Sequence, residues 1–145
     1  MGTLAVCALP LLAGCDGGVQ WEFRTFRDAH EIARDANKLT FVYFRNWYSV
    51  ECTRFEENIL KHPEVLAETR GMVCVPLDFD YDQSLARRWR LQKTPAYVIV
   101  TPDRSILARA DAPITRDDLL EAMRLAKATF APSTQPRTAP EGTPP

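Results

Sequence analysis

The stretch that decides the fold is Leu91–Asp103, LQKTPAYVIVTPD. Its centre, Ala96–Thr101, is a continuous apolar and β-branched run, which is typical of a buried strand. The pair Thr94-Pro95 stands directly before this run, and Pro102-Asp103 follows it in an order favoured for a tight turn. A second run, Ile106–Ala110, begins after a four-residue turn. We therefore expect an antiparallel hairpin.

Helical and strand patterns alternate on either side of this hairpin. Helical segments are expected where apolar residues recur at three- and four-residue steps, and strands where short β-branched runs occur. In chain order the expected elements are a helix over Phe23–Lys38, a strand over Leu39–Arg45, a helix over Glu51–Leu60, a further helical turn over Glu64–Thr69, a strand over Met72–Asp78, a helix over Gln83–Leu91, the two hairpin strands, and a helix from the capping box Thr115-x-x-Asp118 to about Phe130.

This order predicts an α/β fold, with a mixed four-stranded sheet and helices on both of its faces. Because helices link the first three strands, we expect those strands to run parallel through right-handed crossovers. The fourth strand is expected to be antiparallel because a short turn joins it to the third. Pro76 lies inside Met72–Asp78 and has no N–H to donate, which counts against a central position for that strand.

Composition excludes several classes of function. The chain has 145 residues, a formal net charge of −1 and 46% apolar residues, so neither disorder throughout nor strong attraction to nucleic acid is indicated. Its two histidines lie far apart and have no metal-ligand spacing, and no glycine-rich phosphate loop occurs. The cysteines at positions 7, 15, 52 and 74 repeat no pair spacing, so neither a disulfide framework nor a zinc ribbon is predicted. No cofactor or metal is expected.

The N-terminal segment is apolar and ends in a recognisable pattern. The uncharged run Leu4–Ala13 has the length of the apolar region of a signal peptide. Leu12-Ala13-Gly14-Cys15 resembles the bacterial lipobox, which implies cleavage before Cys15 and lipid attachment to it. No Lys or Arg precedes the run, which departs from that pattern, and a frayed apolar N-terminus is the alternative. We expect an exported lipoprotein, anchored in a membrane and facing the periplasm or the cell exterior.

These segments divide the chain into four parts. A signal peptide is expected over residues 1–14, a tether over 15–20 and a folded domain over 21–130. Residues 131–145 hold five of the eleven prolines and no aromatic residue, so this Pro/Thr-rich tail is expected to be disordered.

Residues 21–130 resemble the thioredoxin superfamily. The resemblance rests on the strand Leu39–Phe44 with its preceding helix, on Trp47 followed by the helix that starts near Cys52, on Leu77-Asp78, and above all on Thr94-Pro95 with its strand. It implies that the Thr94–Pro95 bond is cis and lies beside the active site. There the Thr94 backbone would pair with a substrate polypeptide.

The dithiol motif of that superfamily, Trp-Cys-x-x-Cys, is absent. The segment here reads Trp47-Tyr48-Ser49-Val50-Glu51-Cys52. Aligned on the helix, Cys52 matches the second cysteine and Ser49 occupies the first position. Aligned on Trp47, Tyr48 and Glu51 occupy the two positions. We favour the helix alignment, which leaves one extra residue after Trp47.

The residues at this segment have competing interpretations. Ser49 has no adjacent base to activate it and is better interpreted as the N-cap of the helix. Cys52 is either a small apolar residue under the helix or a single reactive thiol. Trp47 and Tyr48, on a loop expected to face Pro95, either contact a polypeptide or pack the loop. A second cysteine, Cys74, is expected to pack in a buried strand.

Two function classes follow. The first is a binding module that takes a polypeptide or an envelope redox protein through the groove at Thr94 and Pro95. The second is a thiol-disulfide oxidoreductase that acts through Cys52 alone.

Overall fold

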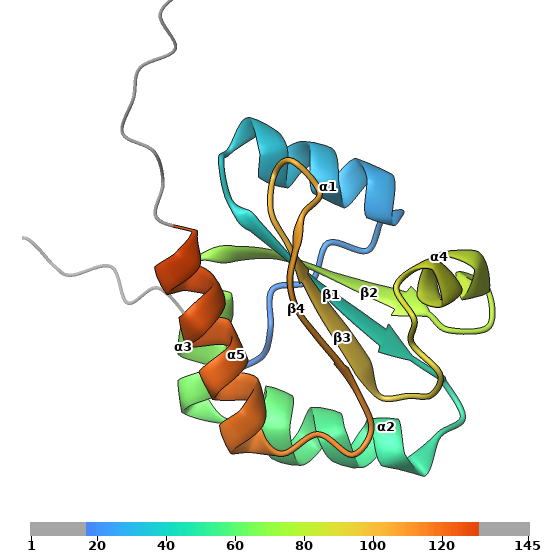
Figure 1. The fold of residues 1–145 in the computed structure, drawn as a ribbon. Helices are drawn as coiled ribbons and strands as arrows, with labels where there is room; N and C mark the ends of the chain where they lie inside the picture. The colour runs from blue at the N-terminus through green and yellow to red at the C-terminus, as the bar shows by residue number, and fades with distance from the viewer. Residues whose placement is uncertain (1–16, 131–145) are drawn as a thin grey trace, which may run out of the picture.

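The computed structural model describes residues 17–130 (Figure 1). The expected signal peptide, Cys15 and the tail over 131–145 lie outside the described residues. The elements are α1 (Phe26–Asp35), β1 (Leu39–Arg45), α2 (Val50–Phe55), the π-helix η1 (Glu56–Leu60), α3 (Pro63–Thr69), β2 (Met72–Asp78), α4 (Gln83–Arg88), β3 (Ala96–Val100), β4 (Ile106–Asp111) and α5 (Arg116–Thr129).

Helix ends differ from the prediction where side chains or backbone angles end the helix early. Helix α1 starts three residues later than expected because the hydroxyl of Thr25 caps it, accepting from the Asp28 N–H. It ends before Asn37, which adopts a positive φ of 51°. Helix α4 likewise ends before Arg90, whose φ is 57°. The capping box at the start of α5 is confirmed, since Thr115 accepts from the Asp118 N–H.

The sheet has the strand order β2-β1-β3-β4, which confirms the predicted mixed four-stranded sheet. Strand β2 lies at an edge, where Pro76 needs no second pairing partner. The prediction of three parallel strands is wrong for the third, because β3 runs antiparallel to β1 while β2 runs parallel to it.

The length of α4 explains this direction. Its six residues span only about 9 Å, whereas the seven residues of β2 extend about 23 Å. A helix this short does not return the chain to the other end of the sheet. In Figure 1, α4 lies beyond the end of β2, and β3 starts from that same end.

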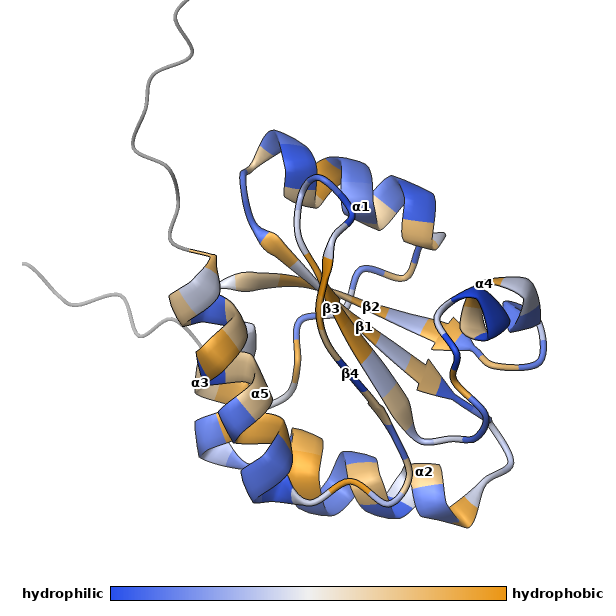
Figure 2. Ribbon diagram, in the orientation of Figure 1, coloured by the Kyte–Doolittle hydropathy of each residue, from blue (hydrophilic) through white to orange (hydrophobic). Residues whose placement is uncertain are grey.

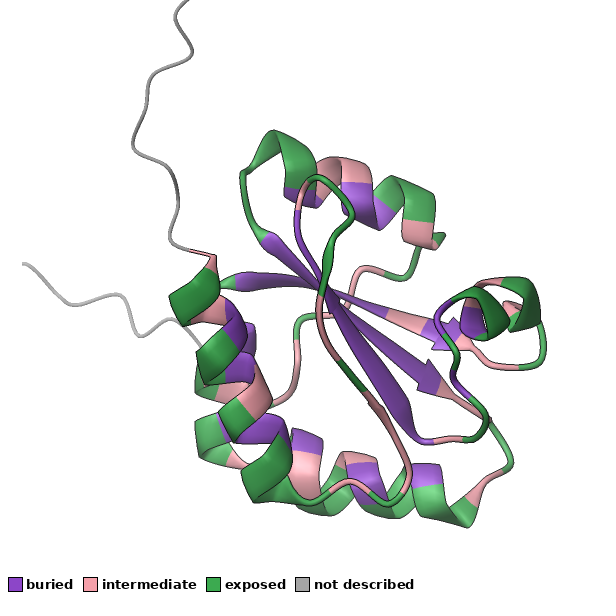
Figure 3. Ribbon diagram, in the orientation of Figure 1, coloured by how far each residue is buried: buried purple, intermediate pink, exposed green. Residues whose placement is uncertain are grey.

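Helices cover both faces of the sheet, as predicted (Figures 2 and 3). One face packs α1 and α4 against alternate strand residues such as Val42 and Val98. The other packs α2, η1, α3 and α5 against Phe41, Tyr43 and Ile99. Because successive side chains of a strand point to opposite faces of the sheet, they divide between two hydrophobic cores. None of the helices within residues 17–130 is long and apolar enough to cross a bilayer.

The helix predicted over Glu51–Leu60 is continuous but changes its winding. After Phe55 the hydrogen bonds widen to five-residue steps, as in the bond from the Lys61 N–H to the Glu56 carbonyl. This π-helical turn decides which side chains of η1 point back toward the sheet.

Candidate functional site

Ser49 begins α2 as its N-cap, as the sequence predicts. Its hydroxyl accepts from the Cys52 N–H at 3.2 Å and donates to Glu51 Oε2 at 3.0 Å. The backbone N–H of Glu51 and then the Ser49 hydroxyl hold the pKa of the Glu51 carboxyl below its usual value. The Ser49 hydroxyl is therefore committed to the helix start, and the lowered pKa of its acceptor, the Glu51 carboxyl, makes that carboxylate a weak base toward the hydroxyl proton.

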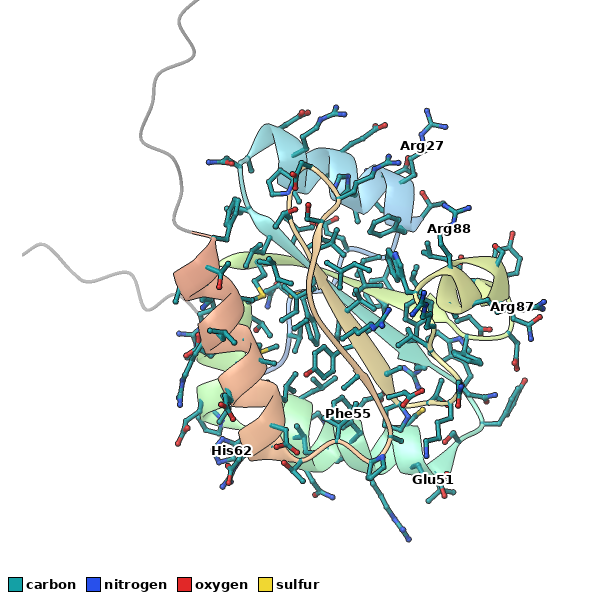
Figure 4. All side chains as sticks on the ribbon, in the orientation of Figure 1. Arg27, Glu51, Phe55, His62, Arg87 and Arg88 are labelled. Atoms are coloured by element: carbon teal, nitrogen blue, oxygen red, sulfur yellow. The ribbon has the colours of Figure 1, made fainter. Side chains whose placement is uncertain are left out.

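Cys52 lies under the first turn of α2. Its side chain is fully buried, and its sulfur accepts from the Asn46 N–H at 3.4 Å. In Figure 4, Glu51 projects outward at the start of the helix, while Phe55 lies one turn further on, against the sheet. Access to the sulfur of Cys52 therefore requires the Asn46–Ser49 loop to move.

Cys74 lies on β2, in the core that packs beneath α3 and α5. Both cysteines of the described chain, Cys52 and Cys74, are free thiols. Burial raises the pKa of the Cys74 thiol to about 12, and its S–H points to the Thr69 carbonyl. Cys74 is therefore a packing residue at neutral pH.

A polar cluster that the sequence analysis missed lies beside Cys52. The Tyr43 hydroxyl donates to Glu56 Oε1 at 3.0 Å, and Arg45 Nε lies 3.3 Å from the same oxygen. Burial, and then the charge of Glu56, raise the pKa of Tyr43, so its hydroxyl remains a donor. The signal in the sequence was the alternation of Tyr43 and Arg45 on one face of an otherwise apolar strand.

Trp47 and Tyr48 are exposed on the loop between β1 and α2. The Arg45 guanidinium carbon lies 3.8 Å from the centroid of the Trp47 ring, which remains 55% exposed. Tyr48 is 96% exposed, and its N–H is held by the Asn46 side chain. These contacts fix the loop while leaving both aromatic rings available to a partner.

Two hollows flank α2 and η1. The first, which we call the Pro95 groove, has a volume of about 390 Å³ and is lined by Glu51, Arg54, Phe55, Asn58, Ile59, Lys93, Pro95, Ala112, Pro113 and Ile114. The second, the edge pocket, also measures about 390 Å³ and is lined by Gly18, Val19, Trp21, Phe23, Tyr43, Arg45, Trp47, Glu56, Glu57, Leu60, Lys61 and Pro76.

These linings separate residues that the sequence analysis placed together. Pro95, whose bond to Thr94 is cis, lies buried at the Pro95 groove. Trp47 lines the edge pocket instead and stacks on Arg45. Ser49 and Cys52 line neither hollow. Within residues 17–130, no group of three His, Cys, Asp or Glu side chains is arranged to hold a metal ion.

Solved structures resemble this chain closely in fold and weakly in sequence. A thioredoxin from Thermus thermophilus superposes with a TM-score of 0.69 at 22% identity, covering 78% of this chain and 90% of its own. The chain has a thioredoxin fold. A putative disulphide-isomerase from Bacteroides thetaiotaomicron gives a TM-score of 0.65 at 18% identity, covering 76% and 93%. The DsbH oxidoreductase gives 0.62 at 16%, covering 87% and 94%.

Sequence comparisons add no closer relative. No family model matches the chain, and no curated protein matches it. The thioredoxin fold is typical of thiol-disulfide oxidoreductases, and this chain carries Ser49 and Cys52 at the start of the helix after its first core strand. The scaffold of that chemistry is present, and the pair of thiols is not.

Proposed function

We propose that this thioredoxin-fold chain is a binding module of the cell envelope, anchored by lipid on Cys15, that takes a polypeptide in the Pro95 groove. One observation carries the proposal: Ser49, which the helix alignment puts at the position of the attacking thiol, caps α2 with its hydroxyl. A dithiol oxidoreductase needs a thiolate there and a second thiol to resolve the mixed disulfide. Cys52 alone, fully buried, supplies neither an exposed nucleophile nor a resolving pair.

The chemistry of the Pro95 groove supports a polypeptide ligand. Its apolar residues include Phe55, Ile59 and Ile114, while Glu51, Arg54 and Lys93 supply charges of both signs. An apolar centre with a polar rim is the usual composition of a protein interface. The groove suits an extended segment with an apolar side chain flanked by polar ones.

Anchoring is supported by the sequence Leu12-Ala13-Gly14-Cys15. We expect the mature protein to begin at Cys15 and to carry acyl chains that retain it in a membrane. Mass spectrometry of the mature N-terminus tests this, and Cys15→Ser should release the protein from the membrane fraction. An unmodified N-terminus would disprove the anchor without affecting the groove.

Binding is tested with fluorescent 15-residue peptides, each with one central Leu, Phe or Trp between polar residues. We expect at least one peptide to bind in an anisotropy titration, and Ile59→Lys to weaken it by roughly tenfold because a charge enters the apolar part of the groove. The matched control is Leu125→Lys, which alters an exposed leucine on α5 outside the groove. Equal weakening by both variants, or no binding at all, would contradict the proposal.

The competing function is single-thiol oxidoreductase activity. The wild-type protein should reduce insulin with dithiothreitol no faster than dithiothreitol alone. Turnover that is present in the wild type and disappears in Cys52→Ala would replace the binding module by an enzyme acting through Cys52.

A further inference from the structure

The proposed function makes no use of the edge pocket. It lies beside the edge strand β2, between η1 and the segment that enters the fold at residues 18–23. Phe23 at its rim is 76% exposed and Trp47 is 55% exposed, whereas ten of the fourteen aromatic side chains of residues 17–130 are buried or half-buried. Exposed apolar rings gathered around one hollow mark an interaction surface.

The chain itself indicates what this surface meets. Gly18 and Val19 line the edge pocket, and Gly18 stands only three positions after Cys15 in the chain. Three residues of extended chain reach at most about 10 Å. If Cys15 carries the lipid anchor, the pocket is held within about that distance of the bilayer surface. The inference therefore rests on the anchoring part of the proposed function.

The side chains at the pocket suit a bilayer interface better than its hydrocarbon core. Trp is enriched at the level of the lipid headgroups, where an apolar ring and a polar N–H are both accommodated. Lys61 is long enough to keep its charge in water while its stem contacts apolar groups. The two cations of the lining are balanced by Glu56 and Glu57, so anionic lipid is not required.

We propose that the edge pocket is a membrane-docking surface, seated on the interface of the bilayer that holds the anchor, so that the Pro95 groove opens away from the membrane. The positions of the lining residues along the helix support the second part of this proposal, that the Pro95 groove opens away from the membrane. Glu57, Leu60 and Lys61 face the edge pocket, and Glu51, Phe55 and Asn58 face the groove. The two sets share no residue, so the edge pocket and the Pro95 groove lie along different sides of the continuous helix formed by α2 and η1. A membrane on one side leaves the other open to a water-soluble polypeptide.

The test places a probe on each side of the helix in the lipidated protein. Glu57→Cys carries a bimane fluorophore at the edge pocket, and Lys93→Cys carries it at the Pro95 groove; both positions are exposed. Cys52 and Cys74 are buried and add no background labelling. Each protein is reconstituted in phosphatidylcholine vesicles with and without lipid that is spin-labelled at the headgroup, and flotation shows first whether it is membrane-bound.

We expect the spin-labelled lipid to quench at least half of the bimane fluorescence at position 57 and little of it at position 93. Combining Phe23→Ser and Trp47→Ser should reduce the quenching at position 57 at least twofold, while the protein still floats. Equal quenching at both positions or stronger quenching at position 93 would overturn the docking surface. Failure to float would instead disprove the anchor, and with it the premise of this orientation.

Discussion

Ser49→Cys tests whether a missing thiol is all that separates this scaffold from a dithiol oxidoreductase. The substitution places a sulfur at the N-cap of α2, three residues before Cys52. The present hydroxyl lies 3.2 Å from the Cys52 N–H, so the two side chains start from adjacent positions in one helical turn. Positions three apart on a helix have Cβ atoms about 5–6 Å apart, and closing a disulfide needs a further approach of only about 1–2 Å.

The expected gain in reactivity follows from the helix N-terminus. Backbone N–H groups there lower the pKa of a thiol from about 8.5 toward about 7, which raises the thiolate fraction at pH 7 about fifteenfold. A thiolate of lower pKa is also a weaker nucleophile, and this offsets about fivefold of the gain. The net expectation is a thiol about threefold more reactive than an unperturbed one. Because Glu51 beside it is negatively charged, adding Glu51→Gln should increase the rate further.

The assay is insulin reduction with dithiothreitol, together with the rate of alkylation at pH 7. Leu125→Cys is the control for an ordinary exposed thiol, and the combination of Ser49→Cys with Cys52→Ala is the control without a resolving thiol. Ser49→Cys should accelerate insulin reduction above the dithiothreitol background and, on oxidation, lose two of the three thiols of its folded domain, with Cys74 left free. An oxidised variant that keeps all three thiols and remains inactive would refute the alignment of Ser49 with the first cysteine position.

Three further outcomes are expected. In the native protein, neither Cys52 nor Cys74 should react with Ellman's reagent until denaturant is added. Both thiols are buried, and burial raises the pKa of Cys74 to about 12. Fast labelling of either cysteine in the native protein would contradict this burial. Tyr43→Phe should lower the free energy of unfolding in urea by about 1–2 kcal/mol, because it removes the hydroxyl that donates to the half-buried carboxylate of Glu56. An unchanged free energy of unfolding would show that this hydrogen bond adds no net stability. Lys127→Met should destabilise the protein by less than about 1 kcal/mol at pH 7 and should have no effect at pH 3. The Lys127 ammonium holds the pKa of Glu68 below its unfolded value, so the stability it contributes is lost as the pH falls through the folded pKa of Glu68. Equal destabilisation at both pH values would contradict the ion pair.

Local signals predicted the elements that depend on neighbouring residues. The strands Leu39–Arg45 and Met72–Asp78 have the predicted bounds because their apolar, β-branched runs end in polar residues. Ser49 and Thr115 were predicted as caps because a side chain that bonds the backbone three residues on needs no tertiary partner.

The direction of β3 and the cluster at Glu56 were not predictable in this way. A helical pattern between two strands usually indicates a parallel crossover, and only the short length of α4 and its place beyond the end of β2 reverse β3. Glu56 is an ordinary exposed-looking carboxylate in a helical pattern. Its contacts with Tyr43 and Arg45 depend on how η1 is wound and where it crosses the sheet.

The sequence by itself determined the α/β class with a mixed four-stranded sheet, the absence of a dithiol motif and the capping role of Ser49, because periodicity, residue identity and short-range hydrogen bonding are all properties of neighbouring residues. The thioredoxin-like assignment came from a resemblance of motifs to that superfamily. Only the tertiary structure decided that Cys52 is fully buried, that Trp47 lies at the edge pocket and not at the Pro95 groove, and that two separate hollows flank α2 and η1. Those features arise where segments distant in the chain meet, and their geometry is set by packing against the sheet rather than by any local preference.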